Sequence, residues 1–136
     1  MRRIVLLTSL YPTLDKDYTV TPVCHYFVKE WKRAGHDVRV VNITSRYFGI
    51  INVLAKPVLS IIKAKTGFSI YTNSPKISNT YIYEGVEVLN IPVKKLYPHQ
   101  YPSLDKCKEI AYEIKRYLDN GNFIPDIITG HIINPS

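Results

Sequence analysis

Glycine is scarce in this chain of 136 residues, and none of its six glycines lies between residues 9 and 22. Those residues follow the first apolar run and form the first polar loop. A dinucleotide-binding turn of the G-x-G-x-x-G type requires glycines there, because the backbone must approach a pyrophosphate closely. The sequence therefore argues against a nicotinamide cofactor.

Cysteine and long apolar runs are also rare. Cys24 and Cys107 are too far apart to form a metal-binding spacing, and we expect both to be reduced thiols in the core. Residues 47–66 are interrupted by three lysines and a proline, so they do not form a membrane span. Residues 4–7 are too few for the core of a secretory signal. We therefore expect a cytoplasmic protein, one that can lie at the inner face of the membrane.

Basic residues outnumber acidic ones, and the formal net charge is +7 with a pI near 9.4. Such a charge attracts nucleic acids, phosphorylated substrates and acidic membrane surfaces. The lysines and arginines are scattered through the predicted helices and loops, without a compact stripe of basic and aromatic residues. We therefore expect no nucleic-acid partner.

The first forty residues predict a strand, a helix and a second strand. Residues 3–9 form a continuous apolar run, which is typical of a strand buried on both faces of a parallel sheet. A helix should begin at Thr21, whose hydroxyl can cap it, with Pro22 in its first turn. Gly35 should end this helix, and residues 37–42 should form the second strand. The predicted buried stripe of the helix is Val23, Phe27 and Trp31.

The middle of the chain predicts further helical and strand segments. Residues 47–66 carry apolar residues at helical spacing and predict one helix, or two that break near Pro57. The pair Glu84 and Gly85 predicts a tight hairpin. Its second strand, residues 86–91, should join the main sheet.

A last helix and strand complete the pattern. Ser103 should cap the helix, and Gly121 should end it. Residues 125–130 predict a short strand whose two isoleucines have no following helix to cover them. We therefore expect the chain to be a truncated piece of a longer protein. The predicted inner side of the helix is Leu104, Ile110, Ile114 and Leu118.

Together these elements predict an α/β fold with a Rossmann-like, doubly wound, mostly parallel sheet and a small β-hairpin. We expect one domain over residues 1–136, with the strands in the order third, second, first, fourth. Ligands should bind beyond the carboxyl ends of the first and fourth strands, where residues 9–22 and 130–136 lie. The amino end of the first helix directs free amides at the same place. The candidate site residues are Ser9, Tyr11, Tyr18, Thr19, Thr21, His25, His131 and Asn134.

Four short segments carry a family resemblance. They are residues 4–12, residues 33–38 (RAGHDV), residues 83–92 (YEGVEVLNIP) and residues 125–131 (PDIITGH). In this order, the segments resemble the amino-terminal domain of family-4 glycosyltransferases, which are retaining enzymes of the GT-B type. The last segment is similar to the P-D-[IV]-[IV]-H-x-H pattern of that family. The resemblance spans essentially the whole chain.

The resemblance implies the acceptor-side domain of a glycosyltransferase that acts in polysaccharide or glycolipid synthesis. The acceptor would be a saccharide or a lipid-linked sugar, and the substrate donor a nucleotide-sugar. The donor-binding carboxyl domain is absent from this chain, so the chain alone should be inactive. The chemistry would need no metal and no other cofactor, and it would proceed through an oxocarbenium-like transition state.

Two positions depart from the family pattern. Tyr18 and Thr19 stand where the family often has two glycines, which shifts any donor-phosphate contact to Thr19 and Thr21. Thr129 stands at the first histidine of the H-x-H pattern. His131 matches the second histidine, which is the functional one, and would contact the acceptor or the sugar.

Several alternatives stay open from the sequence. His25 either packs in the core or contacts the acceptor. Residues 47–66 either pack on the domain or meet an anionic membrane surface through their lysines. The alternative function is a non-enzymatic, Rossmann-like module that binds a nucleotide or another ligand. A hydrolytic triad is not expected, because no nucleophile constellation is convincing.

Overall fold

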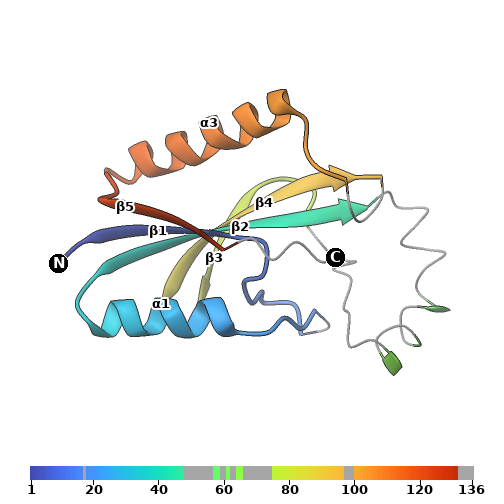
Figure 1. Cartoon of the computed structure of the whole chain (residues 1–136), viewed down its shortest axis with the longest axis horizontal. Helices are drawn as coiled ribbons and strands as arrows, with labels where there is room; N and C mark the ends of the chain where they lie inside the picture. Colours follow the sequence, from blue (N-terminus) through green and yellow to red (C-terminus); the bar gives the residue numbers. More distant parts are fainter. Residues whose placement is uncertain are drawn as a thin grey trace.

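The chain adopts an α/β fold, in which a five-stranded, mostly parallel β-sheet has helices α1 and α3 on opposite faces (Figure 1). The computed structural model describes residues 1–16, 18–47, 57–58, 61, 64–65, 75–96 and 100–131. The predicted fold class, an α/β protein with a mostly parallel sheet and a small hairpin, is confirmed. In chain order the elements are β1 (Arg3–Thr8), α1 (Val23–Arg33), β2 (Asp37–Tyr47), β3 (Asn79–Tyr83), β4 (Val86–Lys95), α3 (Leu104–Asn120) and β5 (Ile127–His131).

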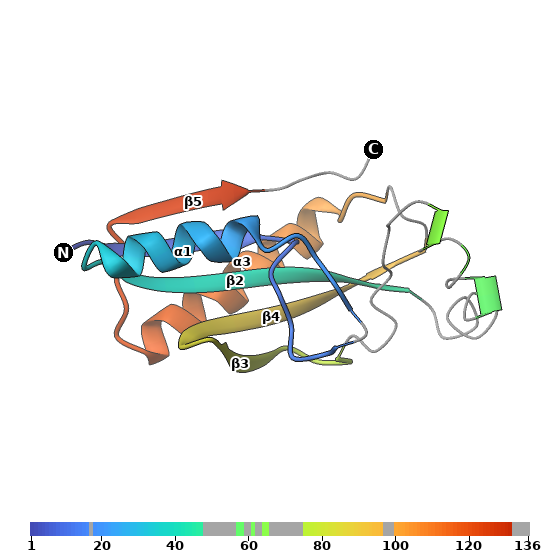
Figure 2. The same cartoon turned by 90° about the horizontal axis from the view of Figure 1, so that it is seen from below.

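The strands lie in the order β3-β4-β2-β1-β5 (Figure 2). β1 pairs in parallel with both β2 and β5, and β2 pairs in parallel with β4. β3 pairs antiparallel to β4 and forms one edge of the sheet. The predicted order is confirmed: the predicted third, second, first and fourth strands are β4, β2, β1 and β5. The additional strand β3 lies outside β4. The chain passes from β1 to β2 through α1, but from β4 back to β5 through α3, so the winding changes direction at β1.

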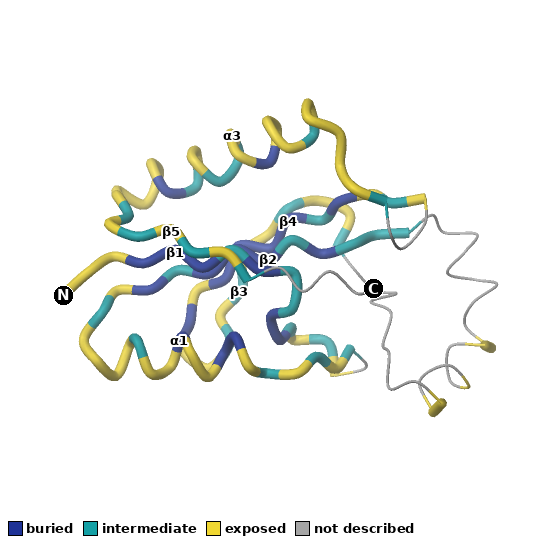
Figure 3. Tube along the Cα trace, viewed as in Figure 1, coloured by how far each residue is buried: buried dark blue, intermediate teal, exposed yellow. Residues whose placement is uncertain are grey.

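The core consists of two apolar layers, one on each face of the sheet. Many of the buried residues lie in the strands between the two helices (Figure 3). Val40 of β2 packs with Val28 of α1 in one layer, and its neighbour Val41 packs with Ile110 of α3 in the other. Successive side chains of a strand point to opposite faces, so a strand that is buried on both faces has a continuous apolar sequence. Full burial of each such valine contributes roughly 1.5–3 kcal/mol.

The β3–β4 hairpin turns at Glu84 and Gly85, as predicted. Glu84 has a φ of 44° and Gly85 a φ of 77°. Two successive positive φ values are those of a type I′ turn, whose twist matches that of the paired strands. Glycine adopts this conformation freely, whereas for Glu84 it costs roughly 1–2 kcal/mol. Hydrogen bonds of the Glu84 side chain, described below, offset this cost.

Helix α1 begins differently from the prediction and ends as predicted. Pro22 is the N-cap residue, and no side chain caps the first turn, so the predicted cap by Thr21 is wrong. A proline is tolerated here because the first-turn amides have no partner within the helix. Gly35 has a φ of 85°, and the amide of His36 donates to the carbonyl of Trp31 at 3.0 Å. These are features of a Schellman motif.

The buried face of α1 is not the predicted one. Val23 and Phe27 are 40% and 52% exposed, and only Trp31 of the predicted stripe packs against the core. Phe27 instead stacks on Trp31 at the surface, with ring centroids 6.4 Å apart. Smaller side chains one residue further along the helix let it lie close to the sheet. The fully buried side chains of α1 are Cys24, His25 and Val28.

Helix α3 follows the prediction more closely. The Ser103 hydroxyl caps it by accepting from the amide of Lys106 at 3.2 Å, and Gly121 is its C-cap residue. Ile110 is buried. The prediction that Leu104 faces inward is wrong, because this first helical residue lies beyond the contact with the sheet and is exposed. Ile114 and Leu118 were also predicted to face inward; Ile114 is partly buried and Leu118 is buried.

Two other predictions need correction. Cys24 and Cys107 are both free thiols, but only Cys24 is buried, whereas Cys107 lies exposed on α3. Tyr47 does not start a helix, because β2 continues to this residue by pairing with β4 as far as Lys95. The rest of the helix predicted over residues 47–66 lies outside the described residues, except at positions 57–58, 61 and 64–65. Among the helices that the structure describes, none is long and apolar enough to cross a membrane.

Candidate functional site at the carboxyl edge of the sheet

The carboxyl ends of β1 and β5 lie side by side where the winding of the sheet changes direction. Residues 9–22 leave β1 there and lead to α1, and β5 ends there at His131. The connections through α1 and α3 run over opposite faces of the sheet (Figure 1). In open α/β sheets, ligands bind at such a place. The predicted location of the site is therefore present in the described chain, although residues 132–136 lie outside it.

A row of polar side chains crosses the sheet level with the carboxyl ends of β1 and β5, whereas β2 and β4 continue beyond it to Tyr47 and Lys95. Thr8 of β1 is in register with Asn42 of β2 and with His131 of β5. Asn42 is in turn in register with Asn90 of β4, which pairs with Asn79 of β3. Residues in register project from the same face of a sheet. This is the α1 face, because residues two positions earlier in β1, β2 and β4 pack in the layer under α1.

Two members of this polar row hold the beginning of the first loop. The Oδ1 of Asn42 accepts from the amide of Tyr11 at 3.3 Å, and its Nδ2 donates to the Tyr11 carbonyl at 3.4 Å. The hydroxyl of Thr8 accepts from the amide of Leu10 at 3.1 Å. Each bond gives a hydrogen-bond partner both to a buried side chain and to the loop backbone, and contributes about 1 kcal/mol to the stability of the fold. The strands thus position the start of the loop.

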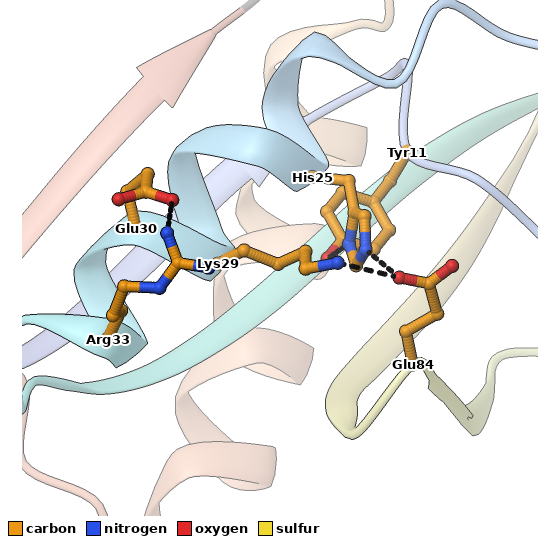
Figure 4. Close-up of polar contacts among 6 residues, drawn as sticks. All are labelled: Tyr11, His25, Lys29, Glu30, Arg33 and Glu84. Carbon is orange, nitrogen blue, oxygen red and sulfur yellow. Dashed lines mark hydrogen bonds and ion pairs between the residues drawn. The ribbon is translucent and has the colours of Figure 1, made fainter.

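Tyr11, His25 and Glu84 form a chain of hydrogen bonds from the core to the surface (Figure 4). The Tyr11 hydroxyl lies 2.7 Å from Nδ1 of His25, and Nε2 of His25 lies 2.9 Å from Oε2 of Glu84. The Lys29 ammonium donates to the same carboxylate oxygen at 3.2 Å. Tyr11 has no exposed surface, and His25 is 3% exposed. The chain of bonds connects the first loop, α1 and the β3–β4 hairpin.

Burial and charge determine where the protons lie in this chain of bonds. Burial raises the pKa of the Tyr11 phenol, so the hydroxyl stays protonated. Hydrogen bonds from His25 and Lys29 lower the pKa of the Glu84 carboxyl. A carboxylate can only accept, so Nε2 of His25 donates to Glu84; in the tautomer with its single proton on Nε2, Nδ1 accepts from the Tyr11 hydroxyl. Glu84 is thereby held as an anion at the hairpin turn.

The ring of Tyr83 packs against the two buried members of this chain of bonds. Its ring packs edge-on against Tyr11, with centroids 6.3 Å apart, and against His25, with centroids 5.0 Å apart. Because Tyr11 is fully enclosed, its side chain is not available to a substrate in this conformation. We interpret Tyr11, His25 and Glu84 as a structural connection. The geometry therefore favours core packing over acceptor contact for His25.

His131, the central residue of the predicted site, ends β5 and is half-buried. Its Nδ1 lies 3.3 Å from the thiol of Cys24, in the first turn of α1. That thiol lies 3.5 Å from the hydroxyl of Thr8. The imidazole is thus held through Nδ1, and among the described residues Nε2 has no hydrogen-bond partner. Nε2 can donate to a ligand if Nδ1 accepts from the thiol, and it can accept if Nδ1 donates.

The remaining predicted residues lie along the first loop. Ser9 and Tyr18 are half-buried, and Thr19 and Thr21 are exposed. The amide of Tyr18 donates to the carbonyl of Asp15 at 3.2 Å, which closes a turn within the loop. The structure thus places Ser9 at the same edge as His131 and leaves the two threonines at the surface before α1. Asn134 lies outside the described residues.

The sequence interpretation missed several polar residues at this edge. A signal was present for Thr8, at the end of the apolar run of β1, whereas Asn42 and Asn90 lie in the middle of β2 and β4. The contact of Cys24 with His131 had no such signal, since the two residues are 107 positions apart. In the part of the chain that the structure describes, no three His, Cys, Asp or Glu side chains are grouped to hold a metal ion. The missed residues are Thr8, Cys24, Asn42, Asn79 and Asn90, together with Glu84 in the hairpin turn before the amino end of β4.

Comparison with known proteins finds no family model, no curated protein and no solved structure that matches this chain.

Proposed function

We propose that this chain is the acceptor-binding part of a nucleotide-sugar-dependent glycosyltransferase with a Rossmann-like, GT-B-type amino-terminal domain. The observation that carries the proposal is the position of His131. It ends β5 beside β1, at the change of winding, with Nδ1 held by Cys24 and Nε2 left for a ligand. The resemblance of residues 125–131 to the family-4 segment supports the same residue independently.

In this proposal His131 contacts a hydroxyl of the acceptor or of the transferred sugar. Its fixed imidazole would orient that hydroxyl toward a donor held by a separate carboxyl domain, which is the partner we expect. Orientation of this kind lowers the activation barrier of the transfer, because the entropy cost of bringing the two reactants together is met on binding. The chain supplies no donor site in this scheme, and its first loop has no glycine turn for a diphosphate. The acceptor is a saccharide or a lipid-linked sugar in polysaccharide or glycolipid synthesis.

The basic charge supports an acceptor at an anionic membrane surface. The chain carries 18 basic and 11 acidic residues. A lipid-linked acceptor is displayed at a surface of negative potential, which attracts basic proteins within a Debye length. Peripheral attachment to the inner face of the membrane is therefore part of the proposal. Residues 47–66, which we expect to provide the contact, lie mostly outside the described residues.

Binding measured by NMR on the ¹⁵N-labelled chain tests the proposal. A panel of oligosaccharides and isoprenyl-diphosphate-linked sugars in micelles should shift the amides of residues 9–11 and 130–131. The His131→Ala variant should bind the same acceptors at least about tenfold more weakly, which corresponds to about 1.4 kcal/mol. Uridine and guanosine diphosphate sugars should bind weakly or not at all. Micromolar binding of such a donor to this chain would contradict the proposal.

The gene sequence after residue 136 provides a second test. We expect it to encode another Rossmann-like domain with paired glutamates that bind the donor. A stop codon at that position would argue for the non-enzymatic ligand-binding module instead.

A further inference from the structure

Asn90 differs from the other buried members of the polar row. Thr8 and Asn42 satisfy their side chains on the backbone of the first loop. Asn90 is only 2% exposed, and its Nδ2 donates to Oδ1 of Asn79 at 3.3 Å. Its Oδ1 is buried and has no partner among the described residues. If the two amides turned over together, one polar atom of Asn90 would still lack a partner.

An unpartnered buried amide atom is costly. A polar group that is buried without a hydrogen bond destabilises a protein by roughly 1–3 kcal/mol. Leucine has the same branching and the same number of heavy side-chain atoms, and it would avoid this cost between the buried residues Leu89 and Ile91 of β4. The polar atom at position 90 therefore points to a hydrogen-bonding partner that does not belong to the described chain.

A cavity of about 80 Å³ lies where such a partner would sit. It lies beside Asn90 in the middle of β4, between the first loop and the β3 edge of the sheet. The hydroxyl of Tyr81 donates to the carbonyl of Pro12 at 2.8 Å, which joins the two sides of the cavity. The cavity is lined by Thr13, Leu14, Asp15, Pro75, Asn79, Tyr81 and Asn90.

The lining of this cavity indicates a neutral, hydroxyl-bearing occupant. Two amides, a hydroxyl and a carboxylate provide hydrogen-bonding groups, and an aromatic ring adds an apolar surface. Among the described residues no lysine or arginine lines the cavity, and it contains Asp15, so an anion such as phosphate would be repelled. The cavity is large enough for several water molecules or for the hydroxyl-bearing edge of one larger ring.

We propose that this cavity is a subsite for a neutral sugar ring, and that Oδ1 of Asn90 accepts a hydrogen bond from a ring hydroxyl. Asn79 and Thr13 lie beside it and provide further hydrogen-bonding groups. The choice of a sugar over other neutral hydroxyl compounds rests on the proposed function. The hydrogen-bonding cavity itself rests on Asn90 alone.

The position of the subsite also specifies the acceptor. Asn90 and His131 belong to one row across the sheet, with β2 and β1 between their strands. Three strand spacings of about 4.8 Å separate them by roughly 14 Å. A ring at Asn90 is therefore remote from a hydroxyl at His131, and the acceptor that reaches both is an oligosaccharide rather than a single sugar.

NMR titration of the ¹⁵N-labelled chain with methyl glycosides of glucose, galactose, mannose and N-acetylglucosamine tests the subsite. At least one glycoside should shift the amides of residues 13–15 and 79–81 and the side-chain amide of Asn90. Inorganic phosphate should not. Longer oligosaccharides of the same sugar should also shift residues 130–131 and bind more tightly.

Asn90→Leu is the decisive variant, because it removes the unpartnered Oδ1 at the cost of one hydrogen bond to exposed Asn79, and its free energy of unfolding should be close to that of the wild type. Glycoside binding should fall at least about tenfold in Asn90→Leu and several-fold in Thr13→Val, which removes a lining hydroxyl that also accepts from the amide of Asp15 at 3.3 Å. Asn120→Leu, at the end of α3, should bind like the wild type. Equal binding by Asn90→Leu and the wild type would overturn the subsite.

The remaining outcomes separate the subsite from the proposed function. If long-lived water contacts the Asn90 amide and no glycoside displaces it, the cavity holds ordered water only and the subsite proposal fails. If acceptors shift residues 130–131 without affecting residues 13–15 or Asn90, the subsite fails while the proposed function stands. If glycosides bind at Asn90 but His131→Ala changes no acceptor affinity, the subsite stands and the proposed role of His131 fails.

Discussion

The phenolic oxygen of Tyr11 lies 2.7 Å from Nδ1 of His25, and both side chains are buried. Tyr11 belongs to the first loop and His25 to the first turn of α1, so this bond connects the loop at the candidate site to the helix that follows it. Glu84 extends the connection to the hairpin at the far edge of the sheet. The predictions below begin with this connection.

Removing the Tyr11 hydroxyl should destabilise the fold. Tyr11→Phe keeps the ring but leaves Nδ1 of buried His25 without its donor, so we expect a loss of about 1–2 kcal/mol in the free energy of unfolding. Urea denaturation followed by circular dichroism measures this. Tyr26→Phe, on the exposed side of α1, is the matched control and should lie within about 0.5 kcal/mol of the wild type. Equal stabilities of the two variants would contradict the hydrogen-bonded role of Tyr11.

Glu84 should make stability depend on acid pH. Its folded-state pKa lies below the ordinary value of 4.5, because His25 and Lys29 stabilise the carboxylate. A group whose pKa is lowered on folding stabilises the protein above its unfolded pKa and loses this effect as the pH falls through the folded pKa.

The advantage of the wild type over Glu84→Gln should therefore be present at pH 7 and disappear on acidification below about pH 4.5. Thermal unfolding over this pH range measures it. Lys29→Gln removes only a secondary contact and should give a smaller change of the same sign. A constant difference between wild type and Glu84→Gln at all pH values would rule out this linkage.

The two predicted helix caps should respond differently to mutation. Ser103→Ala removes a hydroxyl that accepts from the amide of Lys106, and we expect a loss of about 1 kcal/mol. Thr21→Ala should cost much less, because no side chain caps α1. Chemical denaturation of both variants tests the difference. A larger loss for Thr21→Ala than for Ser103→Ala would show that α1 is capped after all.

Backbone conformation distinguishes two glycines that have equally open surroundings. A Cβ added at Gly35 or at Gly130 would meet no atom within 4 Å. Gly35 has a φ of 85°, so Gly35→Ala should cost roughly 1–2 kcal/mol through strain alone. Gly130→Ala should be neutral or slightly stabilising, because alanine reduces the conformational entropy of the unfolded state and so the entropy lost on folding. Denaturation midpoints report the contrast, and a similar loss at both positions would argue against the left-handed helix end.

The two thiols should differ in reactivity. Cys107 is exposed on α3, and Cys24 is 2% exposed beneath the first turn of α1. Iodoacetamide should therefore label one cysteine in the folded protein and both after denaturation. Mass spectrometry of tryptic peptides identifies the labelled residue, and Cys107→Ser should abolish labelling of the folded chain. Rapid labelling of Cys24 in the folded variant would mean that this thiol is not enclosed.

Much of the fold follows from local sequence patterns. The apolar runs of β1 and β2, the hairpin at Glu84 and Gly85, and the cap of α3 at Ser103 are all determined by interactions between near neighbours. The strand order follows from the alternation of strands and helices, together with the rules of connection in such sheets. The location of the candidate site, beyond the carboxyl end of β1, follows from that order.

Other features depend on contacts that no short segment contains. The face that α1 buries was predicted one residue out of register, because two adjacent stripes of the helix are apolar and only the fit to the sheet chooses between them. The length of β2 depends on its pairing with β4. The side-chain partners of the site residues also lie far apart in sequence, as with His131 and Cys24.

The sequence by itself therefore determined the α/β fold class, the strand order and the edge at which His131 lies, because these depend on local patterns and general connection rules. Only the tertiary structure decided which polar side chains are satisfied. In the folded chain Tyr11, His25 and Glu84 are connected by hydrogen bonds, and Nδ1 of His131 contacts Cys24. Within the described part of the chain, the Oδ1 of Asn90 has no partner and lies beside a cavity. The physical reason is that hydrogen bonds form between groups that are close in space, and residues that are far apart in the sequence become neighbours only when the chain folds.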